Sequence, residues 1–153
     1  MTSKLESKIL CRELGRLAGP IAGIGARWAA KRLPSVEYSE RASANITAEA
    51  LFGAASALLR EMGRELPEFQ PASSAYELSA MLGSGIKNLN PTLVFIGVAP
   101  RLPEPEIHLR AVAKEGAIPQ ASAELAVKRF MTALRERLPN NSLKTDGPDG
   151  PRP

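Results

Sequence analysis

The chain contains a single histidine, His108, and the imidazole group is the side chain whose ordinary pKa best suits acid–base chemistry near neutral pH. His108 lies in the alternating segment 106–114, where Glu106 and Arg110 share its polar side. A carboxylate, an imidazole and a guanidinium on one strand face could form a small acid–base site, so His108 is the candidate catalytic residue. The competing interpretation is a solvated strand face, which also requires alternating polar residues.

Other signatures of catalysis and cofactor binding are absent from the sequence. Residues 83–87 (GSGIK) resemble the beginning of a phosphate-binding loop, but they lack its spacing and precede a strand, so we interpret them as a turn. The patterns HExxH, CxxC and GxSxG do not occur. Cys11 is the only cysteine and lies beside an apolar stripe, where we expect it to pack as a small hydrophobic residue. We therefore expect no metal and no cofactor, and His108 is the one candidate for catalysis.

Positive charge is concentrated in the first 33 residues. They hold seven basic and two acidic residues, a net charge of +5, whereas the whole chain carries +4. A basic segment on a nearly neutral body indicates an acidic binding surface: an anionic lipid, a nucleic acid or another protein. The binding candidates are Lys4, Lys8, Arg12, Arg16 and Arg27, with Arg110 and Lys114 extending the set across the predicted sheet.

In a helix, the apolar residues of this segment form one stripe opposite the basic face. The glycines at 15, 19 and 23 recur at a spacing that favours close approach of a second helix. Because Pro20 inside a helix costs about 3 kcal/mol, we expect a kink or break at Gly19-Pro20, unless Pro20 begins a second helix. The stripe consists of Leu10, Leu14, Leu17, Ile21, Ile24 and Trp28.

Two interpretations of this stripe remain open: it packs on the protein's own core, or the segment docks on a partner. The apolar stretch 17–26 is about ten residues long, and a membrane-spanning helix needs about 20. Glu6 and Glu13 also interrupt what would be the basic region of a secretory signal. We expect a cytoplasmic protein that could associate with a membrane surface.

The composition, 44% hydrophobic and 24% charged, fits one domain. We divide the chain into the basic helical segment 1–33, an α+β body 34–138 and a disordered tail 139–153, which is poor in apolar residues. Residues 34–44 look like a polar connector. Helical spacing predicts a helix over 48–62, capped by Asn45 or Thr47, and another from Pro119 to Leu138.

Two segments have clear strand patterns. Residues 92–98 (TLVFIGV) are β-branched and apolar, and residues 106–114 alternate, so we expect them to pair antiparallel. Residues 76–82 also alternate, although Ser74 and Glu77 match the capping box of a short helix. The predicted fold is α+β, with two N-terminal helices, a small antiparallel sheet of two or three strands, one C-terminal helix and a disordered tail. So small a sheet suggests completion by a second copy of the chain.

These observations predict a small non-catalytic binding or assembly protein. Its basic N-terminal helix would dock on an acidic protein partner or an anionic membrane surface. The first alternative is nucleic-acid binding through the same basic face, although the strand 106–114 lacks the aromatic residues that stack on bases. The second alternative is a small enzyme that uses His108.

Overall fold

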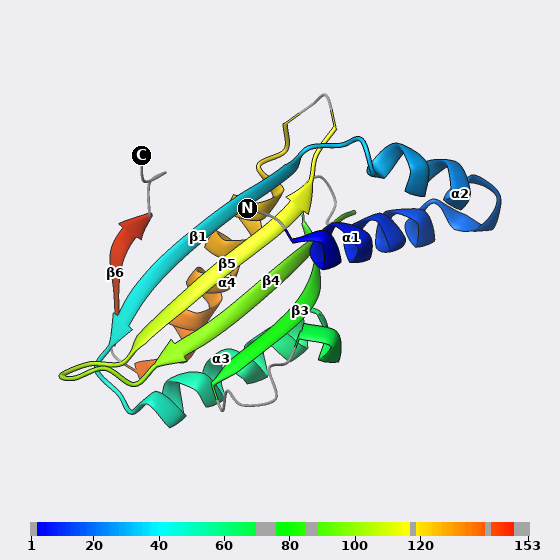
Figure 1. The fold of residues 1–153 in the computed structure, drawn as a ribbon. Coiled ribbons are helices and arrows are strands. Elements are labelled where there is room, and N and C mark those ends of the chain that lie inside the picture. The colour runs from blue at the N-terminus through cyan, green and yellow to red at the C-terminus, as the bar shows by residue number, and fades with distance from the viewer. Residues whose placement is uncertain (1–2, 70–75, 85–88, 117–118, 140–141, 149–153) are drawn as a thin grey trace.

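The computed structural model describes residues 3–69, 76–84, 89–116, 119–139 and 142–148. At its centre is a six-stranded antiparallel sheet of order β2-β3-β4-β5-β1-β6 (Figure 1). The strands are β1 (Ser35–Ala44), β2 (Arg64–Glu65), β3 (Glu77–Ser84), β4 (Asn90–Ala99), β5 (Glu106–Lys114) and β6 (Leu143–Pro148). The helices are α1 (Lys4–Leu17), α2 (Gly19–Ala30), α3 (Ala48–Met62) and α4 (Ser122–Arg137), with a short 3-10 helix at Pro67–Phe69.

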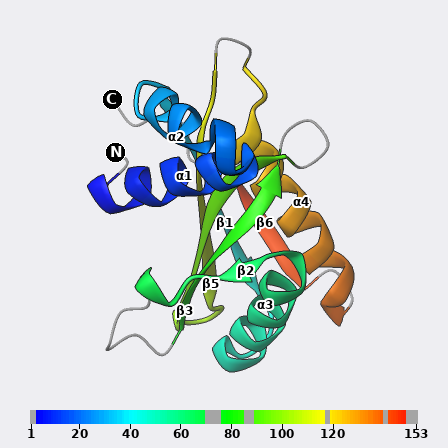
Figure 2. The ribbon, with the colours of Figure 1, turned by 90° about the vertical axis from the view of Figure 1, so that its right-hand side faces the viewer.

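Helices lie on both faces of the sheet, α3 and α4 on one side and the α1–α2 pair on the other (Figure 2). The main core lies under α3 and α4, where burial of each large side chain contributes about 1.5–3 kcal/mol. It includes Leu51, Leu59, Phe130 and Leu134 from the helices and Val94, Ile107 and Leu109 from the sheet. A smaller core on the opposite face joins Ile9 and Leu10 of α1 to Leu66, Met81, Leu93 and Val112.

The predicted sheet of two or three strands, with three helices, is wrong, because the described residues form six strands and four α-helices. The expected connector 34–44 contains β1, which pairs with β5 from Ser35 opposite Lys114 to Ser43 opposite Glu106. Val36, Tyr38, Ala42 and Ala44 face the main core and alternate with polar residues, but Glu40 interrupts the pattern. Six strands also remove the shortage that motivated completion by a second copy.

The predicted disordered tail is likewise corrected, because Leu143–Pro148 form the edge strand β6. This strand pairs antiparallel with β1, and the Asn45 N–H donates to the Ser142 carbonyl over 3.0 Å. Leu143 is buried in the main core. Backbone pairing therefore orders a segment whose side chains alone carry almost no hydrophobic signal.

Several predicted elements are confirmed. The strands over 92–98 and 106–114 pair antiparallel as β4 and β5, and the disputed segment 76–82 is a strand from Glu77 onward, as part of β3. The helix over 48–62 is present, and Thr47 caps it by accepting from the Ala50 N–H over 3.2 Å. The C-terminal helix is present as Ser122–Arg137, so it begins three residues after Pro119, the predicted first helical residue. Ser74 of the competing capping box, and residues 85–87 of the motif that resembles a phosphate loop, lie outside the described residues.

The N-terminal segment folds into a helical hairpin, α1–α2 (Figure 1). The chain reverses at Gly19, whose φ of 80° lies in the left-handed region that glycine adopts without strain. Pro20 lies in the first turn of α2, where its missing N–H has no helical partner to lose. Gly15 and Gly23 face each other where the helices meet, and a Cβ on Gly23 would lie 2.7 Å from the Gly15 carbonyl oxygen.

Candidate functional site

The apolar stripe of the N-terminal segment is divided between two surfaces. Leu10 is completely buried against the sheet, whereas the apolar residues of the second half are exposed. The interpretation that the whole stripe packs on the core is therefore wrong: the reversal at Gly19 turns α2 away from the sheet. We call the exposed residues the apolar face of the hairpin: Leu17 (50% exposed), Ile21 (96%), Ile24 (80%) and Trp28 (57%).

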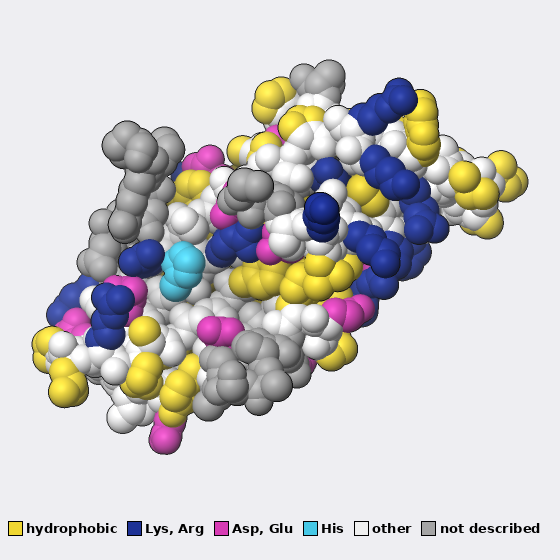
Figure 3. Space-filling view, viewed as in Figure 1, with side chains coloured by type: hydrophobic (Ala, Val, Ile, Leu, Met, Phe, Trp, Pro, Cys, Tyr) yellow, Lys and Arg dark blue, Asp and Glu magenta, His cyan; other side chains and the backbone are white. Residues whose placement is uncertain are grey.

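Basic residues flank this apolar face, and Figure 3 shows the two types side by side at the projecting hairpin. Lys4, Lys8, Arg12, Arg16 and Arg27 are all exposed on α1 or α2. Between Glu13 and Glu37 the sequence has no acidic residue but contains Arg16, Arg27, Lys31 and Arg32. Arg32 stacks on Trp28, 3.7 Å from the ring centroid. Lys4, Lys8, Arg27 and Lys31 form no ion pair with any described residue.

The two other predicted binding residues, Arg110 and Lys114, do not join this surface. Arg110 donates to both carboxylate oxygens of Glu6, over 2.8 and 3.1 Å, and to Glu37 over 2.6 Å. Lys114 is only 4% exposed, and its Nζ donates to the Leu33 carbonyl over 2.9 Å. Sequence reasoning could not exclude them, because their partners are far away along the chain.

The Glu6–Arg110 pair attaches α1 to the centre of the sheet. Burial alone would raise the pKa of the Glu6 carboxyl, but hydrogen bonds from Arg110 and the Ser3 N–H, together with the charge of Arg110, outweigh burial and lower it. The same pairing, followed by the bond to Glu37, raises the pKa of Arg110. Both groups therefore remain charged, and their charges are used within the protein.

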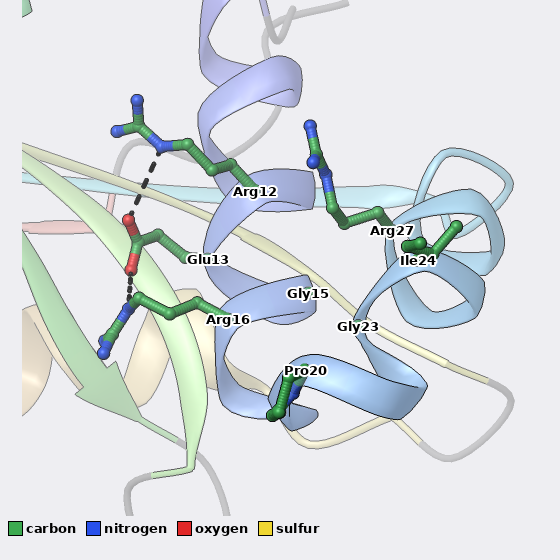
Figure 4. Close-up of a pocket in the computed structure, with 9 residues that line it drawn as sticks. Arg12, Glu13, Gly15, Arg16, Pro20, Gly23, Ile24 and Arg27 are labelled. Carbon is green, nitrogen blue, oxygen red and sulfur yellow. Dashed lines mark hydrogen bonds and ion pairs between the residues drawn. The ribbon is translucent and has the colours of Figure 1, made fainter.

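Glu13 makes a second attachment at the root of the hairpin. Its carboxylate is buried and accepts hydrogen bonds from Arg16 of α1 and Arg64 of β2, each over 2.9 Å. Arg12 lies 3.7 Å away and also approaches Glu68 at 3.4 Å. Figure 4 shows Arg12 and Arg16 converging on Glu13 from the same side of α1. One carboxylate thus fixes the orientation of three arginines.

His108 lies elsewhere, on the part of the sheet face beside α1 (Figure 3). The strand registers place Glu77, Gly97, His108 and Arg41 in one row across β3, β4, β5 and β1. A hollow of about 280 Å³ opens there, next to the aromatic ring of Phe95. The partners predicted for His108 are engaged with other groups, Arg110 as above and Glu106 with Arg101 at 3.2 Å.

Arg110 lines the same hollow as His108, together with Glu6 and Glu77, whereas Glu106 is not among the described residues that line it. Within the described residues there is no group of three or more His, Cys, Asp or Glu side chains that could hold a metal ion. His108 is a half-buried residue on the sheet, whereas the exposed apolar and basic side chains lie together on the hairpin. The hairpin is therefore the stronger candidate for the functional site.

The fold and the site define an α+β protein whose six-stranded antiparallel sheet supports a basic helical hairpin with an exposed apolar face. Comparison with family models, with curated proteins and with solved structures finds no match for the chain. No helix among the described residues is long and apolar enough to cross a membrane. The argument for function therefore starts from the surface of the hairpin.

Proposed function

We propose that this protein is a non-catalytic binding protein that docks on an anionic membrane surface through the α1–α2 hairpin. The observation that carries the proposal is the apolar face of the hairpin, surrounded by cations in a stretch without acidic residues. Peripheral membrane helices combine the same two features, large apolar side chains that enter the acyl boundary and Lys or Arg beside them that attract anionic lipid.

The energies are sufficient for reversible docking. Burial of a large apolar side chain contributes about 1.5–3 kcal/mol, and each cation near an anionic leaflet contributes about 1 kcal/mol. Ile21, Ile24 and two or three of the neighbouring cations together reach roughly 5–9 kcal/mol, which corresponds to a dissociation constant of about 0.2–200 μM. Docking at this strength depends on both kinds of contact, so removal of either should be measurable.

The apolar face distinguishes a membrane from the other acidic surfaces. A nucleic-acid backbone would engage the cations but leave Ile21 and Ile24 in water, where they are 96% and 80% exposed. A second copy of the chain could cover the apolar residues, but it would bring two basic hairpins together. An anionic bilayer offers an apolar interior beneath a negative surface, which matches both features.

The test is co-sedimentation of the full chain with vesicles of phosphatidylcholine alone and of phosphatidylcholine mixed with phosphatidylglycerol. Truncation of the first 33 residues is unsuitable, because it would uncover the core residues Leu93 and Val112 beneath α1. The variant is Ile21→Ser, and its matched control is Leu102→Ser, because Leu102 is also 96% exposed but lies in the loop after β4. We expect binding to the anionic vesicles only, weakened about tenfold by Ile21→Ser and unchanged by Leu102→Ser.

The single tryptophan provides a direct reading of insertion. Trp28 belongs to the apolar face and is 57% exposed, so its fluorescence should shift to shorter wavelength when anionic vesicles are added. Failure of the wild-type chain to bind anionic vesicles would refute the proposal. Equal losses in the Ile21→Ser and Leu102→Ser proteins would also refute it, since the hairpin would then have no special part in binding.

A further inference from the structure

A groove of about 530 Å³ runs between α1 and α2 (Figure 4). Its floor contains Gly15 and Gly23, whose missing side chains let the two helices touch. Arg12 and Arg16 of α1 and Arg27 of α2 line it, and Ile24 of the apolar face borders the same opening. Figure 4 shows the guanidinium ends of Arg12 and Arg16 turned towards Glu13, on the opposite side of α1 from Arg27. Arg27 is therefore the cation that shares the groove with Ile24, a side chain that the proposed function inserts into lipid.

Arg27 depends on the glycine floor for its position. Its stem crosses Gly15 so closely that a Cβ there would lie 2.6 Å from Cδ of Arg27. Figure 4 shows the side chain extending from α2 between the two helices, to the level of Arg12 on α1. Because Arg27 has no ion-pair partner among the described residues, its guanidinium retains its donors for a ligand.

The charge of the groove favours an anion. Glu13 is the one acidic residue among the described residues that line it, and its carboxylate is already bonded to Arg16 and Arg64. Arg12 and Arg16 are paired with Glu68 and Glu13, so the positive charge that the groove offers an anion is that of Arg27. A guanidinium recognises phosphate in particular, because its planar fork of N–H donors matches two phosphate oxygens.

Building on the proposed membrane docking, we infer that Arg27 in this groove binds the phosphate group of an anionic phospholipid. When Ile24 enters the acyl boundary, a long side chain next to it extends back to the phosphate level. The apolar face then determines how deeply the hairpin inserts. Arg27 makes a specific contact with a lipid phosphate, in addition to the diffuse attraction between the cations and the anionic membrane. The inference thus names the lipid group that the hairpin recognises.

The experiment compares Arg27→Gln with Lys31→Gln on the same phosphatidylglycerol vesicles. Both variants remove one positive charge near the end of α2, but Lys31 does not line the groove. Diffuse attraction predicts the same loss for both, about fivefold. A bonded phosphate predicts that Arg27→Gln loses roughly 10- to 100-fold, since charge-assisted hydrogen bonds are lost as well. Circular dichroism and thermal unfolding of each variant establish that its fold is intact.

Arg27→Lys separates charge from geometry, because it keeps the charge but lacks the forked donors. We expect it to bind several-fold more weakly than the wild type. Equal losses in Arg27→Gln and Lys31→Gln, or wild-type affinity in Arg27→Lys, would overturn the phosphate site while leaving membrane docking intact. If Ile21→Ser binds normally and Arg27→Gln does not, the proposed apolar docking fails and an anion contact remains.

Soluble glycerol phosphate distinguishes a lipid from a free phosphate ester. The free ester lacks acyl chains and cannot use the apolar face, so millimolar concentrations should not release the wild-type chain from vesicles. If millimolar glycerol phosphate does release the protein from the vesicles, the groove binds a soluble phosphate ester and the lipid assignment is overturned. Failure of the wild-type chain to bind anionic vesicles would overturn both proposals.

Discussion

Replacing Glu6 by Gln tests how the hairpin is attached to the sheet. The Glu6 side chain is 8% exposed, and its carboxylate joins α1 to Arg110 of β5 by two hydrogen bonds, over 2.8 and 3.1 Å. It also accepts from the Ser3 N–H over 2.8 Å and so closes the capping box that begins α1. Gln has nearly the same shape, so the substitution removes the charge without a large cavity.

The expected loss of stability is about 2–3.5 kcal/mol. Removing one partner of a buried ion pair costs about 3–5 kcal/mol when the other charge is left without compensation. In Glu6→Gln, Arg110 keeps its bond to Glu37, at 2.6 Å, so its charge is still compensated. The cost of losing the ion pair is therefore closer to that of a hydrogen bond to a charged group, about 1.5–3 kcal/mol. The weakened helix cap adds about 0.5 kcal/mol. With a typical slope of about 2 kcal/mol per molar urea, the unfolding midpoint should fall by roughly 1–2 M.

The loss should also depend on pH. The pKa of the Glu6 carboxyl is lowered on folding, so its contribution to stability is present above the ordinary value of 4.5 and is lost as the pH falls through the folded pKa. The wild-type and Glu6→Gln midpoints should therefore differ most at neutral pH and approach each other in acid. Glu37→Gln is the matched control, because its side chain is 33% exposed and should cost less than about 1 kcal/mol.

A Glu6→Gln midpoint that matches the wild type at neutral pH would contradict this reasoning, because the packing of Ile9 and Leu10 would then hold α1 without the ion pair. A difference of constant size down to strongly acidic pH would also contradict it, since a structural defect unrelated to charge would produce that result. Urea unfolding followed by circular dichroism at several pH values decides between these outcomes.

Three further substitutions test local packing and backbone geometry. Gly23→Ala places a Cβ 2.7 Å from the Gly15 carbonyl oxygen, so it should separate the two helices of the hairpin. We expect it to lower the free energy of unfolding by about 1–3 kcal/mol and to speed amide hydrogen exchange in α2. Unchanged exchange would contradict the contact. Ala121→Gly relieves a left-handed residue with φ of 50° and should raise the thermal midpoint by about 1–4 °C, whereas a lower midpoint would count against strain there. Lys114→Met removes the donor to the Leu33 carbonyl and should cost about 1.5–3 kcal/mol in urea unfolding, and an unchanged midpoint would show that this bond is dispensable.

The predictable parts of this fold are those with a strong local pattern. Residues 92–98 are β-branched and apolar, and the helices over 48–62 and 122–137 repeat their apolar residues at helical spacing. The strand β1 carries an alternating signal that the prediction of a connector overlooks: Val36, Tyr38, Ala42 and Ala44 face the main core, and polar residues occupy the positions between them. Glu40 interrupts the alternation and two of the four core residues are alanines, so the segment looks like a polar connector. The strand β6 depends on backbone pairing with β1, which no pattern within the tail encodes.

The sequence predicts which residue types the candidate site contains, but it does not predict which of them are exposed together on one surface. The basic residues of α1 and α2 follow directly from the charge of the first 33 residues. Whether a charge is available depends on tertiary partners, and the partners of Arg110 and Lys114 come from other elements. An amphipathic stripe likewise has the same spacing whether it faces a core or water. Only the reversal at Gly19 decides that Ile21 and Ile24 are exposed.

The structure also explains how a segment with two carboxylates presents a surface of one sign. Glu6 and Glu13 are the only acidic residues before Glu37, and both are buried on the sheet side of α1. Glu6 binds Arg110 and Glu13 binds Arg64, so each carboxylate is neutralised by an arginine from the sheet. The attachment of α1 thus removes negative charge from the exposed side of the hairpin, where the remaining cations surround the apolar face. Anchoring to the sheet and attraction to an anionic membrane therefore arise from the same arrangement of residues.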